Sequence, residues 1–188
     1  MSLSFSFRSA LLAATLLCLA ASPARADLTG GYYNTIKAVQ SNDLETIRQE
    51  VVRGEDLNHE DDQGRTALTY AAIAGNAEML KLLLKGGART SIRDQEGRLP
   101  LQWAVQKDNP DAVAALLDGG AQIDAVDKQG TTPLMMAAEG GNLSVVRLLI
   151  ARHASLNARD YTGRSALDMA QGARQTQIAL LLQRAGAQ

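Results

Sequence analysis

The feature that most constrains the fold of this chain is a repeat with a period of 33 residues. The stretch DQGRTALTYAAIAGN, residues 62–76, returns as KQGTTPLMMAAEGGN, residues 128–142. Two residue types keep the interval through four consecutive units: Gly64, Gly97, Gly130 and Gly163, and Asp61, Asp94, Asp127 and Asp160. A unit this short cannot enclose a core of its own, so the sequence predicts stacked modules that bury apolar faces against their neighbours.

Each unit predicts two helices. Thr132 supplies a capping hydroxyl and Pro133 a backbone angle that suits the first helical turn, so a helix begins there. Gly141 ends it, and apolar residues at helical spacing over 145–150 predict a second, more apolar helix.

Glycine pairs at 86–87 and 119–120 predict left-handed caps at the ends of two second helices. The next unit has Arg152 and His153 at these positions. We expect a local cost there of a few tenths to about 1 kcal/mol.

The full unit combines a D-x-x-G turn, a T-P-L-H-x-A-A segment, a glycine and a V-V-x-L-L-L-x-x-G-A segment, and in this it resembles the ankyrin repeat. The resemblance covers about residues 32–188. It implies an all-α solenoid of helix-turn-helix units with short β-hairpin-like connecting loops. The histidine of the family pattern is replaced by Thr69, Gln102, Met135 and Asp168. Its hydrogen bonds to neighbouring turns must therefore be made otherwise or lost.

The predicted domain, residues 27–188, contains five repeats. Their ranges are 32–60, 61–93, 94–126, 127–159 and 160–188. The first and last are interpreted as capping repeats, because polar residues replace apolar ones where no neighbour is expected to stack. These polar residues are Thr46, Gln49 and Glu50 in the first repeat, and Gln171 and Gln183 in the last.

Residues 1–26 are predicted to be a cleaved signal peptide. The apolar run from Ala10 to Ala21 is too short to span a bilayer as a helix, and Ala24-Arg25-Ala26 has the small-x-small pattern that a signal peptidase needs. We expect cleavage after Ala26, export to a bacterial periplasm and no membrane insertion afterwards. Lipid attachment at Cys18 is the alternative, disfavoured because Leu17 precedes the cysteine.

Charge and cysteine content narrow the function classes. The chain has 19 basic and 20 acidic residues, and loss of Arg8 and Arg25 with the signal leaves a net charge of about −3. No concentrated basic segment suggests nucleic-acid binding. Cys18 is the single cysteine, so the predicted mature chain has neither a disulfide nor a thiol.

No catalytic residue, cofactor site or metal site is predicted. The chain lacks a G-x-S-x-G elbow, and His59 and His153 both fall in predicted turns. The segment His59-Glu60-Asp61-Asp62 could offer ligands to a cation, but consecutive turn residues rarely converge on one point. We interpret it as a solvated turn.

The residues that vary at fixed positions are the candidate partner-binding site. The position before the first alanine of each A-A segment carries Tyr70, Trp103, Met136 and Met169, which the resemblance places in a concave groove. Further candidates lie beside this stripe or at the turn tips: Ile73, Gln106, Lys107, Arg65, Arg98, Gln95, Lys128, Tyr161 and Arg164. Aromatic, Met and Arg side chains often anchor protein interfaces. The alternative is that the stripe only packs along its own helices.

These observations favour a monomeric, non-enzymatic protein-interaction module or adaptor in the periplasm, with a protein partner and no cofactor. One alternative is an immunity or inhibitor protein for a toxin or envelope enzyme, for which an acidic balance would suit a basic target. Another is an accessory factor in envelope or oxidative stress protection, which rests on family analogy alone.

Overall fold

The structure is a computed structural model of the 188-residue chain, and it describes residues 30–188. The predicted signal peptide, its cleavage site and Cys18 lie outside the described residues. Within them, α-helices are joined by turns and loops, without any strand. The prediction of an all-α solenoid of helix-turn-helix units is confirmed.

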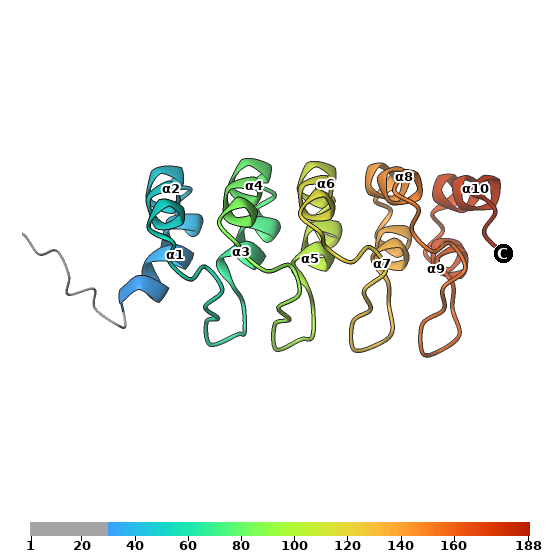
Figure 1. The fold of residues 1–188 in the computed structure, drawn as a ribbon. Helices are drawn as coiled ribbons and strands as arrows, with labels where there is room; N and C mark the ends of the chain where they lie inside the picture. The colour runs from blue at the N-terminus through green and yellow to red at the C-terminus, as the bar shows by residue number, and fades with distance from the viewer. Residues whose placement is uncertain (1–29) are drawn as a thin grey trace, which may run out of the picture.

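Residues 30–188 form five pairs of helices that follow one another in a single row (Figure 1). The first members, here called the inner helices, are α1 (Gly30–Gln40), α3 (Ala67–Ala74), α5 (Pro100–Gln106), α7 (Pro133–Gly140) and α9 (Ala166–Gly172). The second members, the outer helices, are α2 (Leu44–Arg53), α4 (Ala77–Lys85), α6 (Pro110–Asp118), α8 (Leu143–Ala151) and α10 (Thr176–Ala185). A long loop precedes each of the last four inner helices and extends to the side away from the outer helices (Figure 1).

The inner helices begin as the sequence predicts. The Thr132 hydroxyl accepts a hydrogen bond of 3.3 Å from the Met135 backbone N–H, and Pro133 occupies the first turn. The residue that replaces the family histidine often returns a bond to the capping residue. In α5, Gln102 Oε1 accepts from Leu99 N at 2.9 Å, while its Nε2 donates to the Ala125 carbonyl at 3.0 Å. Gln102 thus ties its helix to the connection that leads into the next repeat.

The predicted glycine caps adopt the left-handed conformation, with φ of +92° at Gly87 and +86° at Gly120. His153 occupies the same conformation at φ +64°. A residue with a Cβ is strained there, which agrees with the local cost expected from the sequence.

The periodic residues form a continuous core. Ala71, Ala104, Ala137 and Ala170 are fully buried on the inner helices, and their small side chains let successive repeats approach closely. Leu83, Leu116, Leu149 and Leu182 are fully buried on the outer helices. Truncating any of these leucines to alanine would remove roughly 2–5 kcal/mol of stability, because a cavity would remain in the stack.

Asparagine amides connect successive repeats at the start of the outer helices. Asn76 Nδ2 donates to Asn42 Oδ1 at 2.6 Å. Asn109 Nδ2 donates to the Gly75 carbonyl at 3.3 Å, and Asn142 Nδ2 to the Val105 carbonyl at 2.6 Å. The last two bonds go to main-chain carbonyls near the ends of inner helices, where the helical hydrogen-bond pattern runs out, whereas the first joins two side chains.

The first of the two capping repeats differs in one residue from the sequence expectation. Gln171 and Gln183 are exposed in the last repeat, as a capping role requires. Glu50 is buried, with 4% exposure, so its predicted position at an unstacked surface is wrong. The side chain accepts a hydrogen bond from Thr35 of α1, and among the described residues its Oε2 has no hydrogen-bond donor. Burial raises the pKa of this carboxyl, against the opposing effect of the Thr35 bond.

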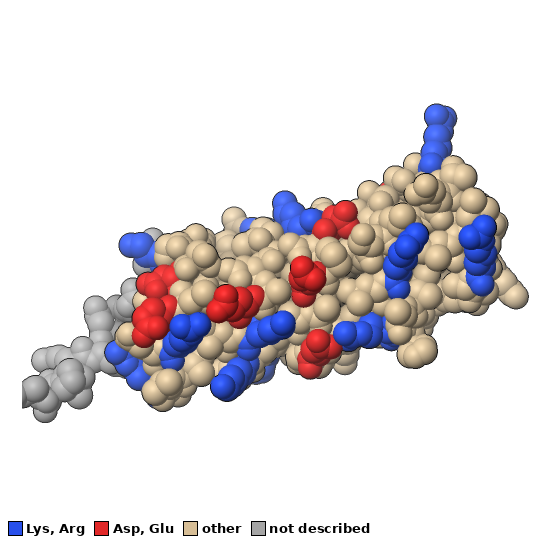
Figure 2. Space-filling view, turned by 90° about the horizontal axis from the view of Figure 1, so that it is seen from above, with Lys and Arg blue, Asp and Glu red and all other residues tan. Residues whose placement is uncertain are grey.

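The outer helices present a charged surface (Figure 2). Acidic and basic side chains alternate over the N-terminal part of this face, whereas only basic ones are visible towards α8 and α10. Across residues 30–188, each helix is too short or too polar to span a membrane.

Candidate functional site: the groove face and the Asp127 pocket

The periodic aspartates organise the loops that precede the inner helices. In the loop before α5, Asp94 N donates to the Arg98 carbonyl at 3.0 Å, which closes a hairpin-like turn. Asp94 Oδ1 accepts from the backbone N–H groups of Glu96 at 3.0 Å and Arg98 at 2.9 Å. Asp61, Asp127 and Asp160 make the corresponding pairs of bonds. One carboxylate oxygen of each is therefore committed to its own turn.

Neighbouring loops are also joined at their tips. Gln95 N donates to the Gln63 carbonyl at 2.9 Å, and Tyr161 N to the Gln129 carbonyl at 3.1 Å. Between the third and fourth repeats a side chain makes the connection, with Lys128 Nζ donating to the Gln95 carbonyl at 2.6 Å. The tips and the exposed side of the inner helices together form what we call the groove face.

The groove face between the second and third repeats is filled by a cluster that we call the Trp103 junction. It consists of Arg65, Asp94, Glu96, Arg98 and Trp103. The indole Nε1–H donates to Asp94 Oδ2 at 2.7 Å. The guanidinium carbons of Arg65 and Arg98 lie 4.7 and 4.8 Å from the centroid of the indole ring, within the range of a cation–π interaction.

Acidic side chains balance the two guanidinium groups of the Trp103 junction. Arg65 lies 3.7 Å from Asp94 Oδ2 and 3.8 Å from Glu96, and Arg98 lies 3.4 Å from Glu96. The Asp94 side chain is only 1% exposed and the Arg65 side chain 19%. The charges are thus balanced within the molecule, although Arg65 Nε has no hydrogen-bond acceptor among the described residues, and Trp103 braces two repeats.

Tyr70 holds the equivalent position one repeat earlier. Its hydroxyl donates to Asp61 Oδ2 at 2.6 Å. Burial alone would raise the pKa of Asp61, but the bonds from Tyr70, Arg65 and Gln63 outweigh it and hold the pKa below the ordinary 3.8. The same bond to Asp61 raises the pKa of the Tyr70 hydroxyl.

In the last repeat an arginine takes this role. Arg164 donates from Nε and Nη2 to Asp160 Oδ2 at 3.0 and 2.9 Å. Burial raises the pKa of Asp160, but hydrogen bonds from Thr162 and Arg164 dominate and lower it from 3.8 to about 2. Three of the four periodic aspartates therefore have a side-chain donor on the second oxygen.

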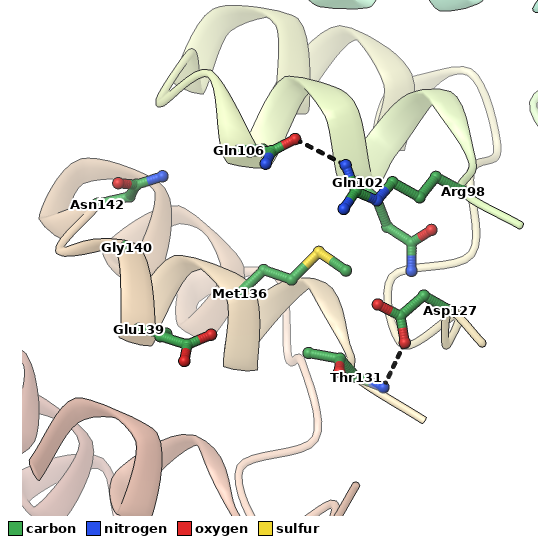
Figure 3. A pocket seen from close by; sticks show the side chains of 9 residues that line it. All are labelled: Arg98, Gln102, Gln106, Asp127, Thr131, Met136, Glu139, Gly140 and Asn142. Carbon is green, nitrogen blue, oxygen red and sulfur yellow. Dashed lines mark hydrogen bonds between the residues drawn. The ribbon is translucent and has the colours of Figure 1, made fainter. Parts of the chain in front are cut away.

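Asp127 is the exception. Gln129 N and Thr131 N donate to its Oδ1 at 2.8 and 2.9 Å. No group within residues 30–188 donates a hydrogen bond to Oδ2, because Met136 stands where Tyr70 and Trp103 carry their donors. A pocket of about 270 Å³ opens beside it between the third and fourth repeats. We call it the Asp127 pocket (Figure 3).

Glu139 and Arg98 also line the Asp127 pocket. Figure 3 shows Met136 between Glu139 on one side and the Asp127–Thr131 turn on the other. Within the described chain, Glu139 and Asp127 make no ion pair, whereas Arg98 donates to Gln106 Oε1 at 3.0 Å and pairs with Glu96. The amide nitrogens of Gln102 and Asn142 donate to the Ala125 and Val105 carbonyls. The pocket thus contains two carboxylates that make no ion pair with the described residues, and one arginine that is already bonded to other side chains.

The predicted site residues separate into distinct environments. Arg65, Arg98 and Trp103 meet in the Trp103 junction, and Met136, Gln106 and Arg98 meet at the Asp127 pocket. Gln95 and Lys128 connect loop tips, and Arg164 pairs with Asp160. Tyr70 and Ile73 are half-buried. Lys107 and Tyr161 are exposed, Tyr161 to 76%. Met169 departs from the expectation of a side chain facing the groove. It is 4% exposed because it packs into the core of the last repeat.

The 33-residue period assigns the aspartates to the turns alone and does not single out Asp127 as a groove feature. A usable signal was present, because the residue nine positions after each aspartate can donate a hydrogen bond in Tyr70 and Trp103 but not in Met136. In the described part of the chain, no three His, Cys, Asp or Glu side chains gather as a metal site would require.

Two family models match the chain. One, described as ankyrin repeats (3 copies), matches residues 35–127, and another, described as ankyrin repeats (many copies), matches residues 116–170. The chain belongs to the ankyrin repeat family. Ankyrin repeats are protein–protein interaction modules, and nothing in these observations shows an enzymatic activity.

A curated relative supports the same assignment. The chain is 41% identical to myotrophin of Xenopus tropicalis over 51 residues, which cover 27% of this chain and 43% of myotrophin. Since the similarity spans less than half of either protein, we carry over the repeat architecture alone.

Proposed function

We propose that this ankyrin repeat protein is an exported interaction module that binds a protein partner on its groove face in the bacterial periplasm. The observation that carries the proposal is the construction of this face. Loop tips fixed by the periodic aspartates stand beside exposed or half-exposed variable residues on α3, α5 and α7. Because these side chains are already held by the stack, little conformational entropy is lost on association.

The periplasmic location rests on the sequence pattern of residues 1–26. Mass measurement of the protein recovered from the native compartment tests it. We expect a mature chain that begins at Asp27. A chain that begins at a lipidated Cys18 would contradict cleavage after Ala26 and indicate a membrane-anchored form.

Partner binding can be tested by affinity capture from the native compartment with double substitutions to glutamate on two faces. The groove variant combines Ile73→Glu and Lys107→Glu, at a half-buried and an exposed position of the groove face. The control combines Lys81→Glu and Arg147→Glu, which are exposed on outer helices α4 and α8.

We expect the partner to be lost with the groove variant and kept with the control, and circular dichroism should show equal helix content for both. Loss with the control alone would place binding on the outer helices and overturn the assignment to the groove.

A further inference from the structure

The Asp127 pocket interrupts an otherwise regular arrangement. Two substitutions along the repeat open it: Met136 replaces Trp103, and Thr131 replaces Arg98. Both replace a large side chain that fills the Trp103 junction with a smaller one. The result is a pocket of about 270 Å³ whose Asp127 carboxylate keeps one oxygen without a donor from residues 30–188.

We propose that the Asp127 pocket receives an arginine side chain from the protein partner, with the guanidinium on Asp127 Oδ2. The proposal rests on the proposed function and names the chemistry that the partner brings to one position of the groove face.

Charge is the first argument for a cationic occupant. Asp127 and Glu139 both line the pocket, and neither makes an ion pair with another described residue. Arg98, the one cation in the lining, is directed to Gln106 and Glu96. A positive side chain entering the pocket would therefore meet a net negative surface, and charge complementarity of this kind selects partners.

The adjacent Trp103 junction shows within the same molecule which occupant such a site accepts. There, the guanidinium of Arg65 lies 3.7 Å from the outer oxygen of Asp94 and covers the ring of Trp103. At the Asp127 pocket the equivalent arginine, Arg98, makes no ion pair with Asp127. The partner would supply the guanidinium that the chain's own residues do not place there.

Two features favour arginine over lysine. A guanidinium is less strongly hydrated than an ammonium group, which suits a partly enclosed pocket. It is also planar, so it can bond to Asp127 through its edge while its face and its aliphatic stem pack on the side chain of Met136, which lies beside Asp127 in Figure 3. Within residues 30–188 the amide nitrogens of Gln102 and Asn142 donate to the Ala125 and Val105 carbonyls, and neither bonds to Asp127.

The test is a nuclear magnetic resonance titration of the purified protein with N-acetyl-arginine amide. The reporters are the ¹³C-labelled methyl group of Met136 and the amide of Thr131, whose N–H bonds to Asp127. The fully buried methyl groups of Met79 and Met135 are internal controls. N-acetyl-citrulline amide serves as a neutral probe of nearly the same shape, and N-acetyl-lysine amide as the other basic probe.

We expect the arginine probe to shift both reporters saturably and the citrulline probe to leave them unchanged. The variant Asp127→Asn should weaken binding of the arginine probe roughly tenfold, because a hydrogen bond to a charged group is lost. Glu139→Gln should weaken it less, and Asp62→Asn, which removes an exposed carboxylate at another loop tip, should leave it unchanged.

Several results would overturn the inference. They are a wild-type protein without saturable shifts, equal shifts with citrulline, tighter binding of the lysine probe, or undiminished binding in Asp127→Asn. Binding that emerges only in Arg98→Gln would show that the chain's own Arg98 fills the pocket in solution. If the probe fails while the groove variant still loses the partner, the proposed function stands and this inference alone falls.

Discussion

The Trp103 junction and the Asp127 pocket occupy equivalent places one repeat apart, yet one is filled and the other open. At the first, an aromatic donor satisfies Asp94 and two arginines cover its ring. At the second, a thioether and a threonine replace the indole and one arginine, and Asp127 keeps an oxygen without a donor from the described chain. The backbone of the turn is the same in both, because Oδ1 of each aspartate accepts two backbone N–H bonds.

The comparison shows how a repeat protein can separate stability from recognition. The residues common to all units build the stack, and each junction then either closes or stays open according to two variable positions. A large amphipathic side chain on the groove face is thus not automatically an anchor for a partner. Trp103 serves mainly to join two repeats, whereas the smaller Met136 leaves room for something else.

The largest expected difference between the two sites is in stability. Trp103→Ala should lower the free energy of unfolding by about 2–3 kcal/mol, because ring burial, the bond to Asp94 and both cation–π contacts are lost. Met136→Ala should cost only about 1 kcal/mol, since its pocket is already open. Urea denaturation of the two variants measures the difference, and equal losses would show that the Trp103 junction is no brace.

A second contrast concerns the aspartates themselves. Asp94→Asn should cost about 2 kcal/mol, since the side chain is 1% exposed and its charge faces Arg65. Asp127→Asn should change the unfolding free energy by less than about 0.5 kcal/mol, because an amide oxygen can still accept the two turn bonds. Thermal denaturation of both variants compares them. A large loss for Asp127→Asn would indicate that its outer oxygen is satisfied in a way the structure does not show.

Removing the donor from the Tyr70–Asp61 pair should imitate the open arrangement. Tyr70→Phe should cost about 1 kcal/mol at neutral pH and move the pKa of Asp61 upward. Since the folded-state pKa of Asp61 lies below 3.8, its contribution is present above that value and is lost as pH falls through the lowered pKa. The two proteins should therefore converge in stability in strong acid. Denaturation curves at neutral and acid pH test this, and a gap independent of pH would mean that packing of the ring, not the bond, is responsible.

The smallest expected effect comes from closing the open site. Met136→Tyr should place a hydroxyl near Asp127 as Tyr70 does near Asp61, and so raise the unfolding free energy by about 0.5 kcal/mol. It should also abolish the shift of the Thr131 amide by the arginine probe. If this variant were stabilised and still bound the arginine probe, the missing donor to Asp127 would not be the reason that the pocket binds a guanidinium.

Much of the architecture followed from the sequence, because the determinants are local and periodic. The hydroxyl at Thr132, the glycines at 87 and 120 and the buried alanines each act within their own unit or its neighbour. The arrangement of the groove was less accessible. Whether Met169 faces outward depends on the packing of the last repeat, and Glu50 turns towards Thr35 of α1. The sequence also does not show that Trp103 reaches back to Asp94, since the eight intervening residues must first fold into a turn and the start of a helix.

Two residues that line the Asp127 pocket, Gln102 and Asn142, also make hydrogen bonds that connect successive repeats. Gln102 donates to the Ala125 carbonyl in the connection before the fourth repeat, and Asn142 donates to the Val105 carbonyl near the end of α5. These bonds should keep the Asp127 pocket rigid. The curvature of the solenoid should therefore be the same with a bound partner and without one. A partner protein would therefore have to adapt its own conformation to a preformed pocket.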